Sequence, residues 1–135
     1  MDHSFLCALA EEFGTPLYVY DEAKIVEQYQ RLKHAFGKQE VKLHYALKAL
    51  NNSNILKILR AKGAGLDAVS IEEVFLGLRA GFAADEIMYT PNCVGFDEIE
   101  QAVELGAMIN IDNLSVLEKF GQRYGASVPV CVRIN

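Results

Sequence analysis

The sequence predicts an α/β fold that corresponds to the first part of a TIM-type (β/α)₈ barrel. Short apolar segments with strand-like alternation begin near residues 41, 65, 86, 108 and 128, at intervals of 20 to 24 residues. Each interval also holds a segment whose apolar residues recur with helical spacing and which ends near a glycine. Regular strand–helix units imply parallel strands joined by right-handed crossovers. The short, even repeat favours a closed barrel over an open doubly wound sheet.

A complete barrel of this type has eight strands. The 135 residues hold five strand segments, and the sequence ends within or just after the fifth. We therefore expect two parts. Residues 1–40 lead into the barrel, and residues 41–135 form its first part, truncated.

The N-terminal part is expected to form a helix, a short strand and a second helix. Ser4 can cap a helix that runs to about Phe13, and residues 17–20 then read as a short strand. Asp21 is a good cap for the second helix, which Gly37 would end. This helix carries an apolar stripe at Ile25, Tyr29, Leu32 and Phe36.

The first barrel strand is expected over residues 41–47, with Lys48 at its carboxyl end. The second barrel helix should turn Val74, Phe75 and Leu78 toward the core. After the first strand, helices and strands are expected to alternate over residues 55–62, 65–69, 72–80, 86–90, 97–105, 108–111, 115–124 and 128–134.

Strand alternation assigns polar side chains to the inner face of the barrel, near the carboxyl ends of the strands. Chemistry in parallel α/β folds is built at that end. Charged groups are costly to bury without a partner, so their recurrence there is difficult to attribute to core packing. An alternative is that some of them only solvate the barrel mouth. The inner-face set is Lys48, Asp67, Thr90, Asp112 and Arg133, with Asn110 and Asn135 on the same face.

The composition restricts the classes of partner. The chain is 51% hydrophobic and 23% charged, with a formal net charge of −5 and no basic block. These values are typical of a soluble globular domain and argue against nucleic acid or an anionic membrane as partner. No apolar run approaches the length of a membrane span. The three cysteines are widely separated, without metal-ligand spacing, which favours a reducing, cytoplasmic setting.

Several common motifs are absent or occur in the wrong context. Residues 63–68 match G-x-G-x-x-A, but they follow a helix and open a strand, the reverse of a dinucleotide site. No phosphate-binding loop or Ser-His-Asp arrangement is present. His44, in mid-strand, is expected to be a satisfied core histidine. Lys48 is either a nucleophilic or imine-forming amine or simply the solvated end of a strand.

Three motifs resemble one known family. The segment 45–49, Y-A-L-K-A, resembles the Y-A-x-K-A strand end of fold-type III pyridoxal-phosphate enzymes. Residues 65–73 are similar to their G-x-D-x-x-S-x-x-E segment, and residues 14–21 resemble the N-terminal motif of diaminopimelate decarboxylases. Residues 111–112 and 132–135 fit later strands. The sequence departs from the family pattern at Leu50, Ile71, Glu72 and the segment Thr90–Cys93.

The resemblance implies a cofactor and roles for four residues. Lys48 would bind pyridoxal phosphate covalently through its amine. Asp67 would orient that amine or balance its charge, and Glu73 and Arg133 would be further partners of the cofactor site. The resemblance also implies a small amino-acid substrate and a homodimer in which a second subunit completes the site.

The resemblance further implies an activity. It is the decarboxylation of meso-diaminopimelate to L-lysine, with this sequence as an N-terminal portion of a lyase of lysine biosynthesis. The 135 residues alone are expected to be inactive. One alternative is another fold-type III decarboxylase of the ornithine, arginine or polyamine type; a racemase fits the N-terminal motif less well. Another is a non-catalytic, cofactor-free relative that acts as a binding module.

Overall fold

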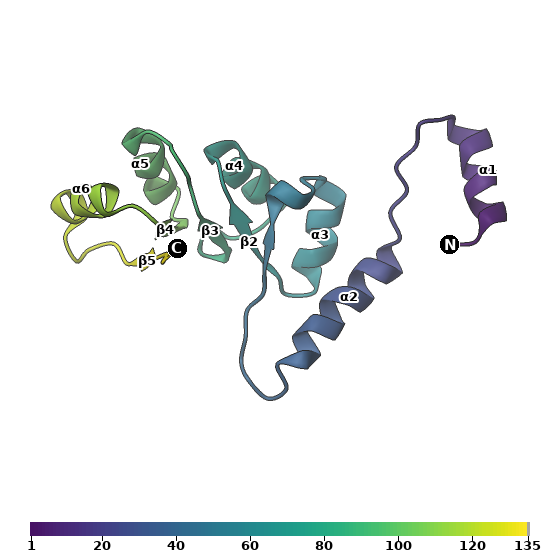
Figure 1. The fold of residues 1–135 in the computed structure, drawn as a ribbon, viewed down its shortest axis with the longest axis horizontal. Helices are drawn as coiled ribbons and strands as arrows, with labels where there is room; N and C mark the ends of the chain where they lie inside the picture. Colours follow the sequence, from purple (N-terminus) through teal and green to yellow (C-terminus); the bar gives the residue numbers. More distant parts are fainter. Residues whose placement is uncertain (135) are drawn as a thin grey trace.

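The computed structural model describes residues 1–134 and contains one parallel sheet with its connecting helices (Figure 1). The prediction that Asn135 faces inward concerns a residue outside the described ones. In chain order the elements are α1 (His3–Phe13), α2 (Glu22–Ala35), β1 (His44–Ala46), the 3-10 helix η1 (Leu47–Ala49), α3 (Ser53–Ala61), β2 (Gly65–Ala68), α4 (Ile71–Arg79), the 3-10 helix η2 (Ala84–Glu86), β3 (Ile87–Tyr89), α5 (Phe96–Glu104), β4 (Met108–Ile111), α6 (Leu114–Tyr124) and β5 (Val130–Val132).

The five strands pair in sequence order, β1-β2-β3-β4-β5, and every pair is parallel. Each strand is followed by a helix before the next strand begins, as the repeat predicted (Figure 1). Strands β1, β3 and β5 are shorter than expected because each is regular only where a neighbouring strand pairs with it. The strand–helix alternation from residue 41 onward is therefore confirmed.

Polar caps begin three of the helices directly after strands or strand turns. The side chain of Asn52 accepts hydrogen bonds from the first turn of α3, and Asn113 does the same for α6. Ser70 caps α4 through the backbone N–H of Glu73. Such caps satisfy N–H groups that a helix start leaves without partners. They also place polar residues at the carboxyl edge of the sheet, where the candidate site lies.

The core lies between the sheet and the helices. Leu66 and Ala68 of β2, Ile87 and Tyr89 of β3, and Ile109 of β4 are almost completely buried. The intervening residues of these strands are partly exposed on the opposite face. The predicted alternation is thus confirmed in β2, β3 and β4, where the buried residues are apolar and the opposite face includes Asp67 and Asn110. In β5 it is not confirmed, because Val132 is 57% exposed.

Helix α4 packs closely on the sheet but turns one predicted core residue outward. A Cβ at Gly77 would lie 2.8 Å from Leu66 Cδ1 and 2.9 Å from Ile87 Cδ1. Val74 is fully buried, whereas Phe75 is 41% exposed. The expectation that Phe75 faces the core was wrong. The neighbouring position is rotated about 100° around the helix axis from Val74, because an α-helix has 3.6 residues per turn.

The N-terminal part differs from the prediction in two ways. Residues 17–20 form no strand, because no strand of the described chain runs beside them, and Tyr18 is 84% exposed. Helix α1 begins at His3 and is capped by Asp2, not by Ser4, because the Asp2 carboxylate accepts the Phe5 N–H. This helix buries no residue and lies apart from the sheet (Figure 1). Among residues 1–134, no helix has the length and apolar character to cross a bilayer.

Candidate active site

Lys48 lies in η1, the short turn that follows β1 at the carboxyl end of the sheet. The preceding side chain, Leu47, is 1% exposed and anchors this turn in the core, whereas Lys48 itself is exposed. The ion pairs of the described residues involve Lys24, Lys42 and Arg123, so Lys48 keeps an uncommitted amine in this part of the chain. An accessible primary amine is what a covalent link to an aldehyde requires.

Asp67 occupies the neighbouring strand at the level of Lys48. Ala46 of β1 pairs in register with Asp67 of β2, and Lys48 follows two residues after Ala46. The turn η1 also contacts β2. The fold therefore brings the two predicted residues to adjacent strands at the same edge of the sheet.

A chain of side-chain hydrogen bonds crosses the inner face from β4 to β2. Asn110 Nδ2 donates to Thr90 Oγ1 at 3.4 Å, and Thr90 Oγ1 donates to Asp67 Oδ1 at 2.6 Å. All three residues are partly buried. Thr90 was predicted on this face, and the structure joins it directly to Asp67. Alternation also predicted an inward Asn110, but its link to the site depends on a contact between strands.

Glu73 closes the turn between β2 and α4. Its Oε2 accepts the Val69 N–H at 2.8 Å, and its own N–H donates to Ser70 Oγ at 3.4 Å. Reciprocal bonds of this type resemble a capping box and explain the spacing of Ser70 and Glu73. One Glu73 oxygen therefore stabilises the backbone two residues after Asp67. A direct contact between Glu73 and a cofactor stays a prediction.

Arg133 and Asp112 lie at the same edge but outside the hydrogen-bonded chain. The Arg133 backbone N–H donates to Ile111 O at 2.9 Å, and the Arg133 side chain is exposed. Asp112 lines a separate cavity of about 190 Å³, together with Asn92 and Cys93 of the loop after β3. The role predicted for Arg133 stays a prediction.

His44 forms a packing contact with β2, as expected for a satisfied histidine. Its Nδ1 lies 3.0 Å from Leu66 O, so this nitrogen carries a proton and donates to the carbonyl. A Cβ at Gly65 would lie 2.7 Å from His44 Cε1 and 2.8 Å from Glu86 O. Only glycine at position 65 leaves room for the imidazole ring and for the backbone carbonyl of Glu86 at the end of η2.

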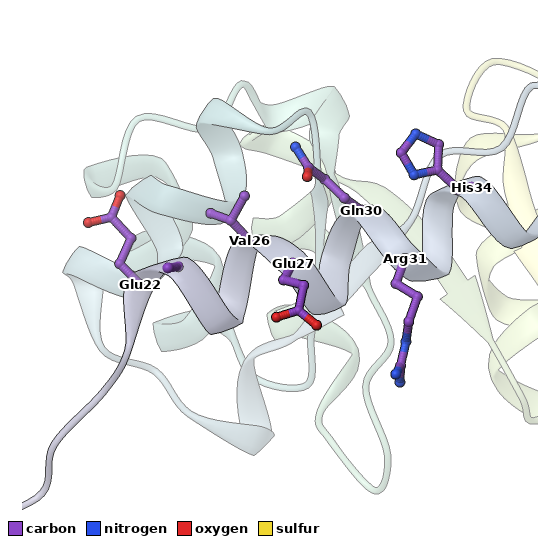
Figure 2. A pocket seen from close by; sticks show the side chains of 7 residues that line it. Glu22, Val26, Glu27, Gln30, Arg31 and His34 are labelled. Atoms are coloured by element: carbon purple, nitrogen blue, oxygen red, sulfur yellow. The ribbon is translucent and has the colours of Figure 1, made fainter. Parts of the chain in front are cut away.

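A surface hollow of about 850 Å³ lies elsewhere, along one helix. Figure 2 shows that its side chains project from a single helix, α2, and do not converge on a common point. None of the predicted site residues lines it. Its lining consists of Glu22, Ala23, Val26, Glu27, Gln30, Arg31 and His34.

Comparisons with known proteins agree with this geometry. Residues 22–135 match the family described as pyridoxal-dependent decarboxylase, pyridoxal binding domain. A diaminopimelate decarboxylase of Methanothermobacter thermautotrophicus is 41% identical over 129 residues, which are 94% of this chain and 30% of that protein. A diaminopimelate decarboxylase of Bacillus subtilis is 35% identical over 132 residues, 93% of this chain and 30% of that protein.

Solved structures give the same fold. The lysine/ornithine decarboxylase of Vibrio vulnificus complexed with putrescine superposes with a TM-score of 0.86 at 35% identity, covering 97% of this chain and 36% of that one. The diaminopimelate decarboxylase of Helicobacter pylori complexed with L-lysine gives 0.84 at 33% identity, covering 96% and 34%. The chain thus spans about a third of the length of these relatives. The partial-barrel prediction is confirmed. The chain belongs to the pyridoxal-dependent decarboxylase family, and its residues 22–135 match the pyridoxal binding domain of that family.

Proposed function

We propose that the whole protein that carries this chain is a pyridoxal-phosphate-dependent amino-acid decarboxylase, a carbon–carbon lyase. The observation that carries the proposal is the uncommitted amine of Lys48 at the carboxyl end of β1, one strand away from the carboxylate of Asp67. Membership in the family supports the same cofactor. A cofactor-free relative would not need an accessible lysine at this position.

The residues present fit pyridoxal phosphate. Lys48 offers the amine that would hold its aldehyde carbon, and Asp67 offers a negative charge beside that link. The inner face carries Asp67, Thr90 and Asn110 and is partly open, so a polar cofactor finds hydrogen-bonding groups there. When bound, the cofactor supplies an electron sink for the bond to the departing carboxyl group.

The residues of this chain would bind the cofactor and orient it. Lys48 would hold the cofactor through its amine. Asp67 balances positive charge at the anchoring nitrogen and fixes its direction. Glu73 keeps the turn after Asp67 closed through the Val69 N–H. Arg133, exposed at the end of β5, would add a positive charge at the same edge.

For the substrate we propose meso-diaminopimelate, with L-lysine as product. The support is the 41% identity to a relative named diaminopimelate decarboxylase and the resemblance of residues 14–21 to the N-terminal motif of that branch. A second candidate is a basic amino acid such as ornithine or lysine. The likeness to a lysine/ornithine decarboxylase, with a TM-score of 0.86, favours keeping this candidate.

We also propose that the whole protein is a cytoplasmic homodimer. The cysteines Cys7, Cys93 and Cys131 are free and exposed in the described chain, as is typical of a reducing compartment. The homodimer rests on the resemblance to fold-type III enzymes, whose sites are completed by a second subunit. Sedimentation at micromolar concentration measures this assembly, and a stable monomer with full activity would contradict it.

An absorbance experiment tests the cofactor assignment. The whole protein is mixed with pyridoxal phosphate, and we expect a visible band that borohydride removes and that Lys48→Ala lacks. Lys57→Ala is the matched control, because Lys57 is an exposed lysine on α3. A wild-type protein without the band would refute the proposal. Carbon dioxide release from meso-diaminopimelate, ornithine, lysine and arginine then distinguishes the two substrate candidates.

A further inference from the structure

The hydrogen-bonded chain on the inner face carries an inference beyond the binding of the cofactor. We propose that Thr90 is a positioning residue that fixes the carboxylate of Asp67 beside Lys48, and that Asn110 acts through Thr90 by setting the direction of its hydroxyl proton. This inference rests on the proposed function, since it assigns a task to residues that support the same site.

A threonine hydroxyl has one proton to donate and lone pairs that accept. At Thr90 the proton goes to Asp67 Oδ1 at 2.6 Å, and a lone pair accepts the amide of Asn110 at 3.4 Å. The Asn110 amide donates and cannot accept the proton, so it leaves Asp67 as the only partner for that proton in this chain of bonds. The shorter bond has an ionised acceptor, as expected for a charge-assisted hydrogen bond.

The backbone holds Thr90 in place for this contact. The Thr90 N–H donates to Ala68 O at 2.8 Å, which ties the residue to the strand that carries Asp67. In β3 and β4, Tyr89 pairs with Ile109, so Thr90 and Asn110 follow at the same level. The hydroxyl is therefore located by β2 on one side and by β4 on the other.

The consequence is a carboxylate with one oxygen committed and one free. Asp67 Oδ1 accepts from Thr90, whereas Oδ2 has no hydrogen-bond donor among residues 1–134. A carboxylate held at one oxygen keeps a fixed orientation for the other, and fixed orientation reduces the entropy lost on binding. The pairing of Ala46 with Asp67 places this carboxylate on the strand next to Lys48, at the same edge of the sheet.

Two substitutions at position 90 separate the hydroxyl from its packing. Thr90→Val keeps the shape and removes the hydroxyl, whereas Thr90→Ser keeps the hydroxyl and removes a methyl group. In the whole protein, spectral titration with pyridoxal phosphate should give a dissociation constant roughly tenfold higher for Thr90→Val, which corresponds to about 1.4 kcal/mol. Thr90→Ser should have a dissociation constant for pyridoxal phosphate within about twofold of the wild-type value.

A double-mutant cycle tests the part assigned to Asn110. Asn110→Ala alone should weaken cofactor binding, but in the Thr90→Val background it should add nothing, because its action passes through the missing hydroxyl. Additive effects would overturn the role of Asn110. Wild-type affinity in Thr90→Val, or an equal loss in Thr90→Ser, would overturn the role of Thr90. Absence of the cofactor band in the wild-type protein would instead overturn the proposed function and this inference together.

Discussion

Tyr89→Phe tests the buried network that holds the strands and helices together behind the site. Tyr89 is 0% exposed, and its hydroxyl donates to Glu98 Oε1 of α5. The same carboxylate oxygen accepts the Ile71 N–H at 3.3 Å, in the first turn of α4. Glu98 therefore joins β3, α4 and α5, and Ile71 lies only four residues after Asp67. The substitution removes one bond and leaves the Ile71 contact in place.

The size of the stability loss in Tyr89→Phe follows from the charge and exposure of Glu98. A hydrogen bond to a charged group contributes about 1.5–3 kcal/mol to stability. Because Glu98 is only partly buried, we expect the lower end of this range, a loss of about 1.5 kcal/mol at pH 8. The free energy of unfolding, measured by urea titration of the whole protein, reports this loss.

The loss should depend on pH in a defined direction. Burial, and then the hydrogen bond to Glu98 and its charge, raise the pKa of the Tyr89 hydroxyl far above its ordinary value of 10.0. The stability that depends on the protonated hydroxyl is complete below pH 10 and falls as pH rises, because the unfolded chain loses this proton first. Phenylalanine has no such proton. The difference in free energy of unfolding between wild type and Tyr89→Phe should therefore decrease by about 1.4 kcal/mol per pH unit above roughly pH 10.

The matched control is Tyr18→Phe, because Tyr18 is highly exposed. This variant should change the free energy of unfolding by no more than about 0.5 kcal/mol at both pH 8 and pH 11. A gap for Tyr89→Phe that stays constant from pH 8 to pH 11 would refute the raised pKa. A gap at pH 8 no larger than that of the control would refute the contribution of the hydrogen bond to Glu98.

Three further outcomes are expected. Gly65→Ala should lower stability by about 1–3 kcal/mol in urea titrations, because its Cβ would collide with His44; an unchanged midpoint would contradict the close approach. Leu56→Ala, at a fully buried position, should cost about 2–5 kcal/mol, whereas Leu114→Ala at an exposed one should cost under about 0.5 kcal/mol. The 135-residue chain alone should associate in light scattering, because its inner face is open and Val132 on the edge strand is 57% exposed; a monodisperse monomer would contradict this.

The barrel portion was predictable because periodicity and local signals agree there. Helical spacing, strand alternation and terminal glycines all indicate the same elements from residue 41 onward. Residues 17–20 illustrate the opposite case. Their pattern is typical of a strand, but a strand also needs a neighbour to pair with, and the sequence does not contain that information. The prediction for Phe75 was wrong for a related reason. A shift of one position along a helix changes whether a side chain faces the core or the solvent.

The candidate site was predictable residue by residue but not as a network. Alternation placed Asp67, Thr90 and Asn110 on the inner face, yet it could not show that a bond joins β3 to β2 and another joins β4 to β3. Those contacts depend on the stagger between strands, which the pairing register determines. Glu73 was assigned to the cofactor by resemblance, and its bond to the Val69 N–H depends on the geometry of one turn.

The two faces of the sheet explain why this fold can carry chemistry without losing stability. On β3, Ile87 and Tyr89 face the helices and are completely buried, so the outer face provides the apolar contacts that hold the strands. Met88 and Thr90, between and after them, are then free of any packing requirement on that face. Because successive residues alternate between the faces, each strand can supply one polar group at its carboxyl end and still contribute to the core, and Lys48, Asp67 and Thr90 follow this pattern.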